Sequence, residues 1–179
     1  VMVLGTLFHR NPSDEAARSL YVWIVEAARQ PAFYSSVGVP DTVDGRFEMV
    51  ALHAFLVLRR LKREPRRAAS LSQALFDAMF ADMDENLREM GAGDLGVGRR
   101  VKRMATALYG RIAAYEAGLK GDDMALQAAL RRNLFGTADP TAEQLGLVTA
   151  YLRRNEVGLA AQPLDALLAG RVEFSAVAD

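Results

Sequence analysis

The chain has 179 residues, about half of them apolar, and its formal net charge is zero. This length suits one domain, and the neutral balance means that only a local patch of charge could attract nucleic acid or an acidic membrane. The absence of cysteine excludes a disulfide framework and a thiol nucleophile, and two histidines, His9 and His53, are too few for a typical histidine metal site. No run of about 20 apolar residues predicts a membrane-spanning helix, and we expect no signal or transit peptide at the N-terminus.

The first predicted helix begins after Asn11 and runs to about residue 29. Asn11 can cap it, Pro12 suits its first turn, and apolar residues recur at helical spacing. A turn at residues 39–42 precedes a long helix over about residues 44–63, which the Glu64-Pro65 pair ends. Between Met49 and Leu58 this helix is apolar around much of its circumference, so we expect it at the centre of a bundle.

The next stretch reverses its charge at a glycine-rich joint. An acidic helix is predicted over residues 70–90 and a basic helix over residues 98–119, joined through Gly91, Gly93, Gly96 and Gly98. The reversal could clamp two antiparallel helices together, with Asp82, Asp84, Glu85 and Glu89 pairing across the hairpin. It could instead leave a basic face free for a partner, and the sequence leaves both interpretations open.

Three further helices are predicted over residues 123–135, 141–159 and 163–168, followed by an extended tail or lone strand over residues 171–176. The pattern predicts an all-α, single-domain bundle of about six or seven helices with no substantial sheet. We expect an N-terminal segment (1–12), a helical domain (13–170) and a C-terminal tail (171–179).

No pattern in the chain predicts catalysis, a cofactor or a metal site. The glycines of GAGDLGVG match no nucleotide-binding fingerprint and are better read as a helix end and a helix start. His53 has no second histidine or nucleophile placed beside it, which favours a core or interface histidine. Asp41, Asp44 and Glu48 could hold a divalent ion, but helix capping and the helix dipole explain them more simply.

Two arginine-rich clusters are candidates for a binding patch. The cluster with fewer local acids is our first candidate for an exposed patch, and it contains Arg59, Arg60, Lys62, Arg63, Arg66 and Arg67. The second contains Arg99, Arg100, Lys102 and Arg103. Contact with RNA or anionic lipid through phosphates, and docking of a partner protein, are the functions we consider for them. Methionines at predicted core positions also leave open a groove that receives a partner helix.

Two longer stretches resemble a known family. They are QPAFYSSVGVPDTVDGRFEMVALHAFLVLRRL and FDAMFADMDENLREMGAGDLGVGRRVKRMATALYGRIAAYEAGL, preceded by LYVWIVEAAR. Together they resemble the ubiquinol–cytochrome c reductase (complex III) assembly chaperones over about residues 20–119. The resemblance implies an all-helical, non-enzymatic bacterial chaperone without a cofactor. It implies binding of newly made cytochrome b or another complex III subunit, in the bacterial cytoplasm or at the cytoplasmic face of the inner membrane. The ribosome, a small partner protein and peripheral membrane contact are further partners that it brings into consideration.

The residues carrying these motifs form our candidate client-binding or partner-binding surface. They are Phe33, Tyr34, Asp41, Asp44, Arg46, Glu89, Asp94, Arg99, Arg103 and Tyr109. Each could instead be structural, and Asp44 and Arg46 in particular occupy a predicted helix start. The alternative function is an RNA- or ribosome-binding helical module that uses the two arginine clusters.

Overall fold

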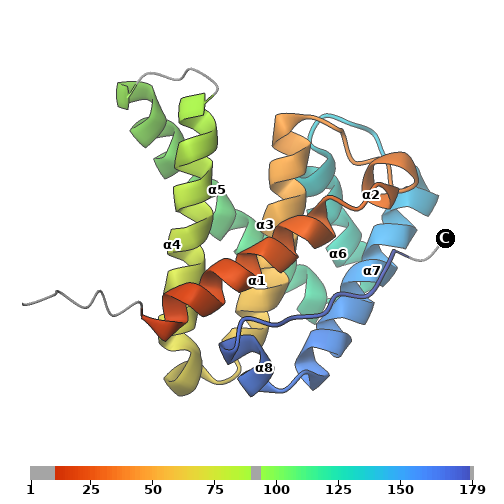
Figure 1. Cartoon of the computed structure of the whole chain (residues 1–179). Coiled ribbons are helices and arrows are strands. Elements are labelled where there is room, and N and C mark those ends of the chain that lie inside the picture. The colour runs from red at the N-terminus through yellow and green to blue at the C-terminus, as the bar shows by residue number, and fades with distance from the viewer. Residues whose placement is uncertain (1–10, 90–93, 178–179) are drawn as a thin grey trace, which may run out of the picture.

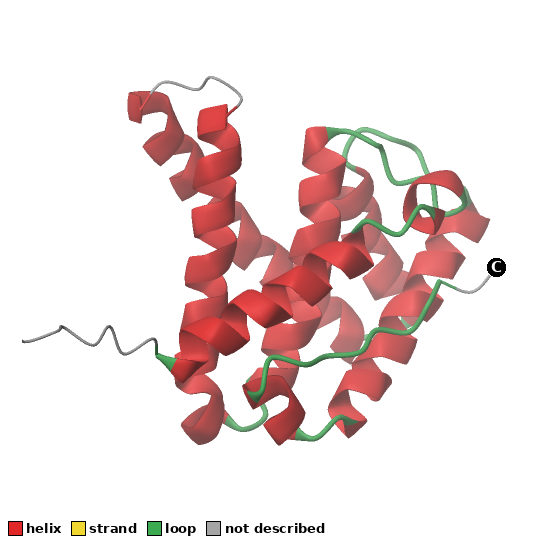
Figure 2. Ribbon diagram, in the orientation of Figure 1, coloured by secondary structure: helices red, strands yellow, loops and turns green. Residues whose placement is uncertain are grey.

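The structure is a computed structural model that describes residues 11–89 and 94–177, without the side chains of Leu87, of residues 94–97 and of Arg100. Over this part the chain forms eight α-helices, six of them of seven or more residues, one π-helical segment and no strand (Figure 2). The predicted all-α class is confirmed. The elements are α1 (Pro12–Ala28), α2 (Ala32–Ser35), α3 (Val43–Leu61), α4 (Pro65–Glu89), α5 (Asp94–Lys120), α6 (Asp123–Leu130), the π-helix η1 (Arg131–Phe135), α7 (Ala142–Ala161) and α8 (Leu164–Leu168).

Side-chain caps fix where several of these helices begin. The Asn11 side chain accepts a hydrogen bond from the backbone N–H of Ser13, and Thr42 accepts one from Gly45. Thr141 and Gln144 form a complete capping box at the start of α7. Such caps satisfy N–H groups that the first turn of a helix leaves without a partner, and Asn11 was predicted as a cap for this reason.

Helix α3 lies at the centre of the bundle, as its sequence predicted. Every residue from Ala51 to Val57 is buried, so neighbours cover this helix on all sides. Helices α1 and α4 pack on it from one side and α7, α5 and η1 from others, with α1 crossing in front of both α3 and α4 (Figure 1). The core is therefore built around the most uniformly apolar segment of the chain.

Two helix starts differ from the prediction. Helix α4 begins at Pro65, five residues before the expected start, because a proline fits the first helical turn, where its missing N–H costs nothing. Helix α5 begins at Asp94 instead of residue 98, so Gly96 and Gly98 lie within the helix and are not part of a joint. Gly91 and Gly93 fall outside the described residues.

Residues 171–177 run in an extended conformation across α3 towards α7, and we call them the C-terminal strap (Figure 1, dark blue). The Gln162 side chain donates to the Glu173 carbonyl at 2.8 Å and accepts from the Glu173 N–H at 3.0 Å. Val172 and Val177 are buried, and the Phe174 ring lies 5.1 Å from that of His53. The sequence predicted either an extended tail or a lone strand here, and the strap is extended. It packs as part of the core.

Candidate partner-binding surface

His53 is a core residue with both ring nitrogens satisfied. It is fully buried on α3, with Nδ1 2.7 Å from the Met49 carbonyl oxygen and Nε2 2.7 Å from the Tyr151 hydroxyl. A carbonyl only accepts, so Nδ1 carries the proton and Nε2 accepts from Tyr151. Burial lowers the pKa of His53 to about 4. His53 therefore joins α3 to α7 as a neutral imidazole, in agreement with the core interpretation.

The arginine cluster that was our first candidate for an exposed patch is largely neutralised. Arg59 lies 2.9 Å from Glu116 and 2.8 Å from Glu156, and only 19% of its side chain is exposed. The Nε of Arg59 is close enough to Glu116 for an ion pair, but its N–H does not point at the carboxylate, so the two groups form no hydrogen bond. Arg59 thus ties α3 to both α5 and α7, and the prediction that it belongs to an exposed patch was wrong.

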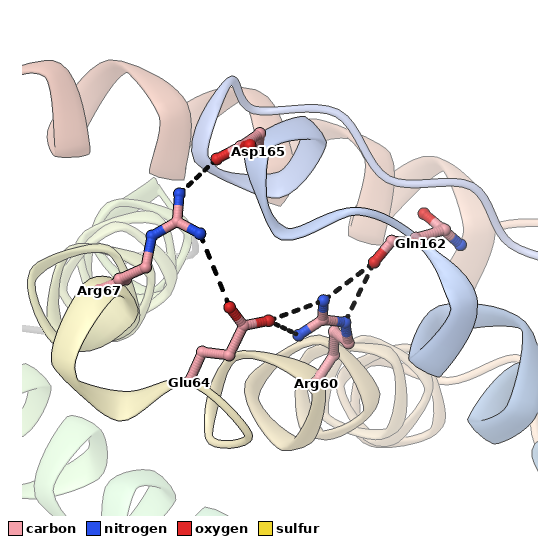
Figure 3. A network of polar contacts seen from close by, with 5 residues as sticks. All are labelled: Arg60, Glu64, Arg67, Gln162 and Asp165. Carbon is pink, nitrogen blue, oxygen red and sulfur yellow. Dashed lines mark hydrogen bonds and ion pairs between the residues drawn. The ribbon is translucent and has the colours of Figure 1, made fainter.

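Arg60 and Arg67 also have partners brought in from elsewhere in the chain (Figure 3). Arg60 is buried, pairs with Glu64 at 3.1 Å and donates to the backbone carbonyl of Gln162. Arg67 pairs with Asp165 at 2.5 Å. Three exposed members of the cluster, Lys62, Arg63 and Arg66, make no ion pair with a described residue. The patch is therefore half the size that the sequence indicated.

The first turns of α5 carry exposed cations. Arg99, Lys102 and Arg103 are exposed, and none of them forms an ion pair within the described part of the chain. On α4, Asp82 accepts a hydrogen bond from the Tyr21 hydroxyl at 2.8 Å, and Asp84 pairs with Arg88 in its own helix. Among side chains that the structure describes, no charge clamp joins these acids to Arg99 or Arg103.

Further along α5, Arg111 points inward. It forms an ion pair with Glu48 of α3, which is buried, and its guanidinium carbon lies 5.6 Å from the centre of the Phe47 ring. Burial raises the pKa of the Glu48 carboxyl, and the guanidinium of Arg111 opposes that rise. This pair fixes the middle of α5 on the central helix, so the exposed cations of α5 lie on a helix that is held in place.

Phe76 and Phe80 of α4 and Tyr109 of α5 form an aromatic patch. The Tyr109 and Phe76 rings stack at 5.7 Å with an interplanar angle of 24°, and the Phe76 and Phe80 rings stack at 6.4 Å. Tyr109 is 61% exposed, and both phenylalanines are half-buried. Phe76 and Phe80 lie on the apolar face of α4 and pack against the core. Their partial exposure depends on how α5 packs on α4, which spacing cannot indicate.

The other candidate residues lie at the corner between α2 and α3. Phe33 is fully buried and meets the Tyr151 ring edge-on at 4.9 Å, so it is a packing residue and not part of a surface. The Tyr34 hydroxyl donates to the Ala28 carbonyl oxygen at 2.9 Å. Asp41 and Arg46 are exposed and pair with each other at 2.7 Å. Asp44 is exposed in the first turn of α3.

The candidate residues thus fall into two groups. One group is at the α2–α3 corner and the other is on α4 and α5, and Figure 1 shows these parts on opposite sides of α3. Glu89 is exposed at the end of α4, and Asp94 starts α5, although its side chain and that of Arg100 lie outside the described residues.

Within the described ranges, no cluster of acidic and histidine side chains could hold a metal ion, and no helix is long and apolar enough to cross a membrane.

Comparison with known proteins assigns the chain to a family. The family described as ubiquinol-cytochrome C chaperone matches residues 35–174, more than three quarters of the chain. The chain belongs to this family. The resemblance recognised in the sequence is confirmed, and the family is one of assembly factors for ubiquinol–cytochrome c reductase.

Individual relatives point to the same family. The ubiquinol-cytochrome-c reductase complex assembly factor 1 of Xenopus laevis is 28% identical over 78% of this chain and 70% of its own length. The mitochondrial protein CBP3 of Saccharomyces cerevisiae is 32% identical, over 58% of this chain and only 32% of its own length. The crystal structure of the Cbp3 homolog from Brucella abortus matches with a TM-score of 0.82 and 39% identity, covering 93% of this chain and 92% of that one.

Proposed function

We propose that this chain is a non-catalytic assembly chaperone that binds newly made cytochrome b, or another unassembled subunit, during construction of ubiquinol–cytochrome c reductase. The observation that carries the proposal is membership of the assembly-factor family over residues 35–174, together with a fold match across nearly the whole chain to the Brucella protein. We place its action in the bacterial cytoplasm or at the cytoplasmic face of the inner membrane, where such a subunit would be inserted.

The surface chemistry supports binding of a protein client. Aromatic side chains that are exposed next to arginine are enriched in the cores of protein interfaces, and isolated charges on a surface are not. The aromatic patch of Phe76, Phe80 and Tyr109 lies on the same α5 as the exposed cations, and Lys102 stands two helical turns before Tyr109 on the same side of that helix. We therefore propose the α4–α5 side of the molecule as the client-binding surface, with Glu89 and Asp94 at its end.

Two other surfaces are left for further partners. Lys62, Arg63 and Arg66 form an exposed basic corner between α3 and α4, which could attract a ribosome or an anionic membrane by charge. Tyr34, Asp41, Asp44 and Arg46 at the α2–α3 corner are our proposed contact for a small partner protein. The Asp41–Arg46 pair is exposed on both sides, so its two charges can exchange partners at little cost in free energy.

The test is capture of the client from growing cells. Tagged protein is cross-linked in cells that are labelled briefly with heavy amino acids, and the captured proteins are identified by mass spectrometry. We expect newly labelled cytochrome b to be enriched over the mature, unlabelled pool. Tyr109→Ala should reduce the capture, whereas Met124→Ala, which removes a 79% exposed side chain from α6, should not. Capture of ribosomal RNA or soluble proteins without a complex III subunit would overturn the proposal.

A further inference from the structure

We infer that the outer face of α5 receives an apolar helix of the client, one end of which carries carboxylates. This inference rests on the proposed function, because it names the kind of segment that the chaperone binds. The outer face of α5 is defined by exposed residues at helical spacing: Arg99, Lys102, Arg103, Thr106, Tyr109, Gly110, Ala113 and Ala117. The first three are cationic and the last five carry no charge. This face thus has a charged end and, from Thr106 to Ala117, an uncharged stretch that we call its uncharged end; Lys120 beyond it is already paired with Glu116 at 3.1 Å.

The charged end calls for an acidic partner. Arg99, Lys102 and Arg103 extend over little more than one turn of the helix, all exposed and without an ion pair to a described residue. Three like charges this close repel one another, and the repulsion is relieved when carboxylates approach. By contrast, Arg59, Arg60 and Arg67 already have acidic partners within the fold and would gain little from a partner.

The uncharged end calls for an apolar side-chain surface. Tyr109 is exposed but held in place by its stack on Phe76, so it can contact a partner with little loss of conformational entropy. Next to it, Gly110 is exposed, and a side chain built there would meet no atom within 4 Å. A partner side chain can therefore approach the backbone of α5 closely at Gly110, one residue after the tyrosine.

The shape of the face favours a helix over an extended peptide. The backbone N–H and C=O groups of α5 between Arg99 and Ala117 are engaged within the helix, so they offer nothing to an extended strand. An extended segment laid on this face would leave its own backbone groups without partners when water is excluded. A helix satisfies its backbone internally and presents only side chains, as helix-in-groove complexes do.

The first experiment uses a substitution that should not harm the fold. Gly110→Leu fills the open approach to the backbone of α5 at that position, and because leucine has a higher helix propensity than glycine, the melting temperature should stay the same or rise. Capture of newly made cytochrome b should fall at least tenfold. Gly158→Leu on α7 is the matched control, since that glycine also has open space around it, and it should capture as wild type does. Undiminished capture by Gly110→Leu would overturn the inference while leaving the proposed function intact.

The second experiment tests the face without relying on the identity of the client. Two synthetic alanine–leucine helical peptides of about 20 residues are compared by fluorescence anisotropy, one with three glutamates in its first turn and the other with three lysines there. Wild type should bind the glutamate peptide at least tenfold more tightly, and Arg99→Glu with Arg103→Glu should reverse that preference. Arg63→Glu with Arg66→Glu should retain it.

The two experiments separate the possible failures. If wild type captures no complex III subunit but discriminates between the peptides through Arg99 and Arg103, the proposed client is wrong and the helix-binding face stands. If wild type binds both peptides equally, or if the charge reversal at residues 63 and 66 abolishes the preference, the inference about α5 is wrong whatever the client is.

Discussion

At the scale of single residues, His53 couples folding to pH. In the folded chain it stays neutral to about pH 4, whereas in the unfolded chain it takes up a proton near pH 6.5. The folded state thus binds fewer protons between these values. Its stability is complete above pH 6.5 and decreases as the pH falls towards 4. The rings of Phe33, Tyr151 and Phe174 around the imidazole bring no charge that could stabilise the protonated form.

We predict that His53 alone lowers the free energy of unfolding by about 2 kcal/mol between pH 7 and pH 5. Urea unfolding of wild type at these two pH values measures the total change, to which carboxyl groups such as Glu48 also contribute. The His53→Gln variant keeps a hydrogen-bond donor and an acceptor but does not titrate. The free energy of unfolding that wild type loses between pH 7 and pH 5 beyond the loss in the variant is therefore the contribution of His53. Equal losses in wild type and variant would contradict the assignment.

Arg59 and Arg63 have similar sequence neighbourhoods but different surroundings in the fold. Replacing Arg59 by alanine leaves Glu116 and Glu156 partly buried without their shared cation, and we expect a loss of about 2 kcal/mol in the free energy of unfolding. Arg63→Ala should change that free energy by less than about 0.5 kcal/mol, because Arg63 is exposed and has no described partner. Chemical denaturation of both variants tests the contrast, and similar losses would show that Arg63 has a structural role.

At the scale of elements, the sequence predicted most helices because their signals are local. Asn11 and Thr141 cap helices where expected, and the uniform apolar pattern of residues 49–58 correctly placed α3 in the centre. The start of α5 was misplaced because glycines inside a helix look the same in sequence as glycines in a joint. The conversion of the last turn after Leu130 into a π-helix has no local signal that we can identify.

The candidate surface was predicted less well than the helices, since surface charge depends on neighbours far along the chain. Arg59 is neutralised by residues of α5 and α7, and Arg67 by Asp165. Nothing in the sequence around residues 59–67 indicates those partners. Tyr109 was selected through its motif, and the structure adds that it stacks on Phe76. Local patterns thus find the helices, and only the packed chain shows which charges remain available.

The junction between the turn at residues 39–42 and α3 depends on Gly45. A side-chain carbon at this position would overlap the Pro40 carbonyl oxygen, which is rigid backbone. We expect Gly45→Ala to lower the free energy of unfolding by about 2 kcal/mol despite the better helix propensity of alanine. Gly158→Ala has open space and should raise the free energy by about 0.5 kcal/mol. Thermal and urea unfolding of both proteins, compared with wild type, checks the opposite signs.

At the scale of the whole molecule, the C-terminal strap holds together elements that are far apart in the sequence. It inserts Phe174 against His53 of α3, and its backbone is bound by Gln162 and Asn155 of the α7 region. Its buried valines, Val172 and Val177, add apolar contacts to the same core. The strap is therefore part of the cover of α3, even though it forms no regular secondary structure.

Removing residues 172–179 should lower the free energy of unfolding by about 3 kcal/mol, because two buried valines and the Phe174 contact are lost, partly offset by the chain entropy that is regained. Denaturation in urea measures the loss, and binding of a hydrophobic dye reports exposure of α3. Glu173→Ala in the full chain is the control, since Gln162 binds only the backbone of Glu173. A truncated chain as stable as wild type would show that the strap is peripheral.

The position of the strap also bears on how the molecule is made. A chain is synthesised from its N-terminus, so α3 leaves the site of synthesis long before Phe174 exists to cover it. Until then, the central helix of the protein lacks part of its cover, and contacts between residues so distant in sequence form slowly. A protein that we propose protects an unfinished subunit would itself need protection until Phe174 has been made.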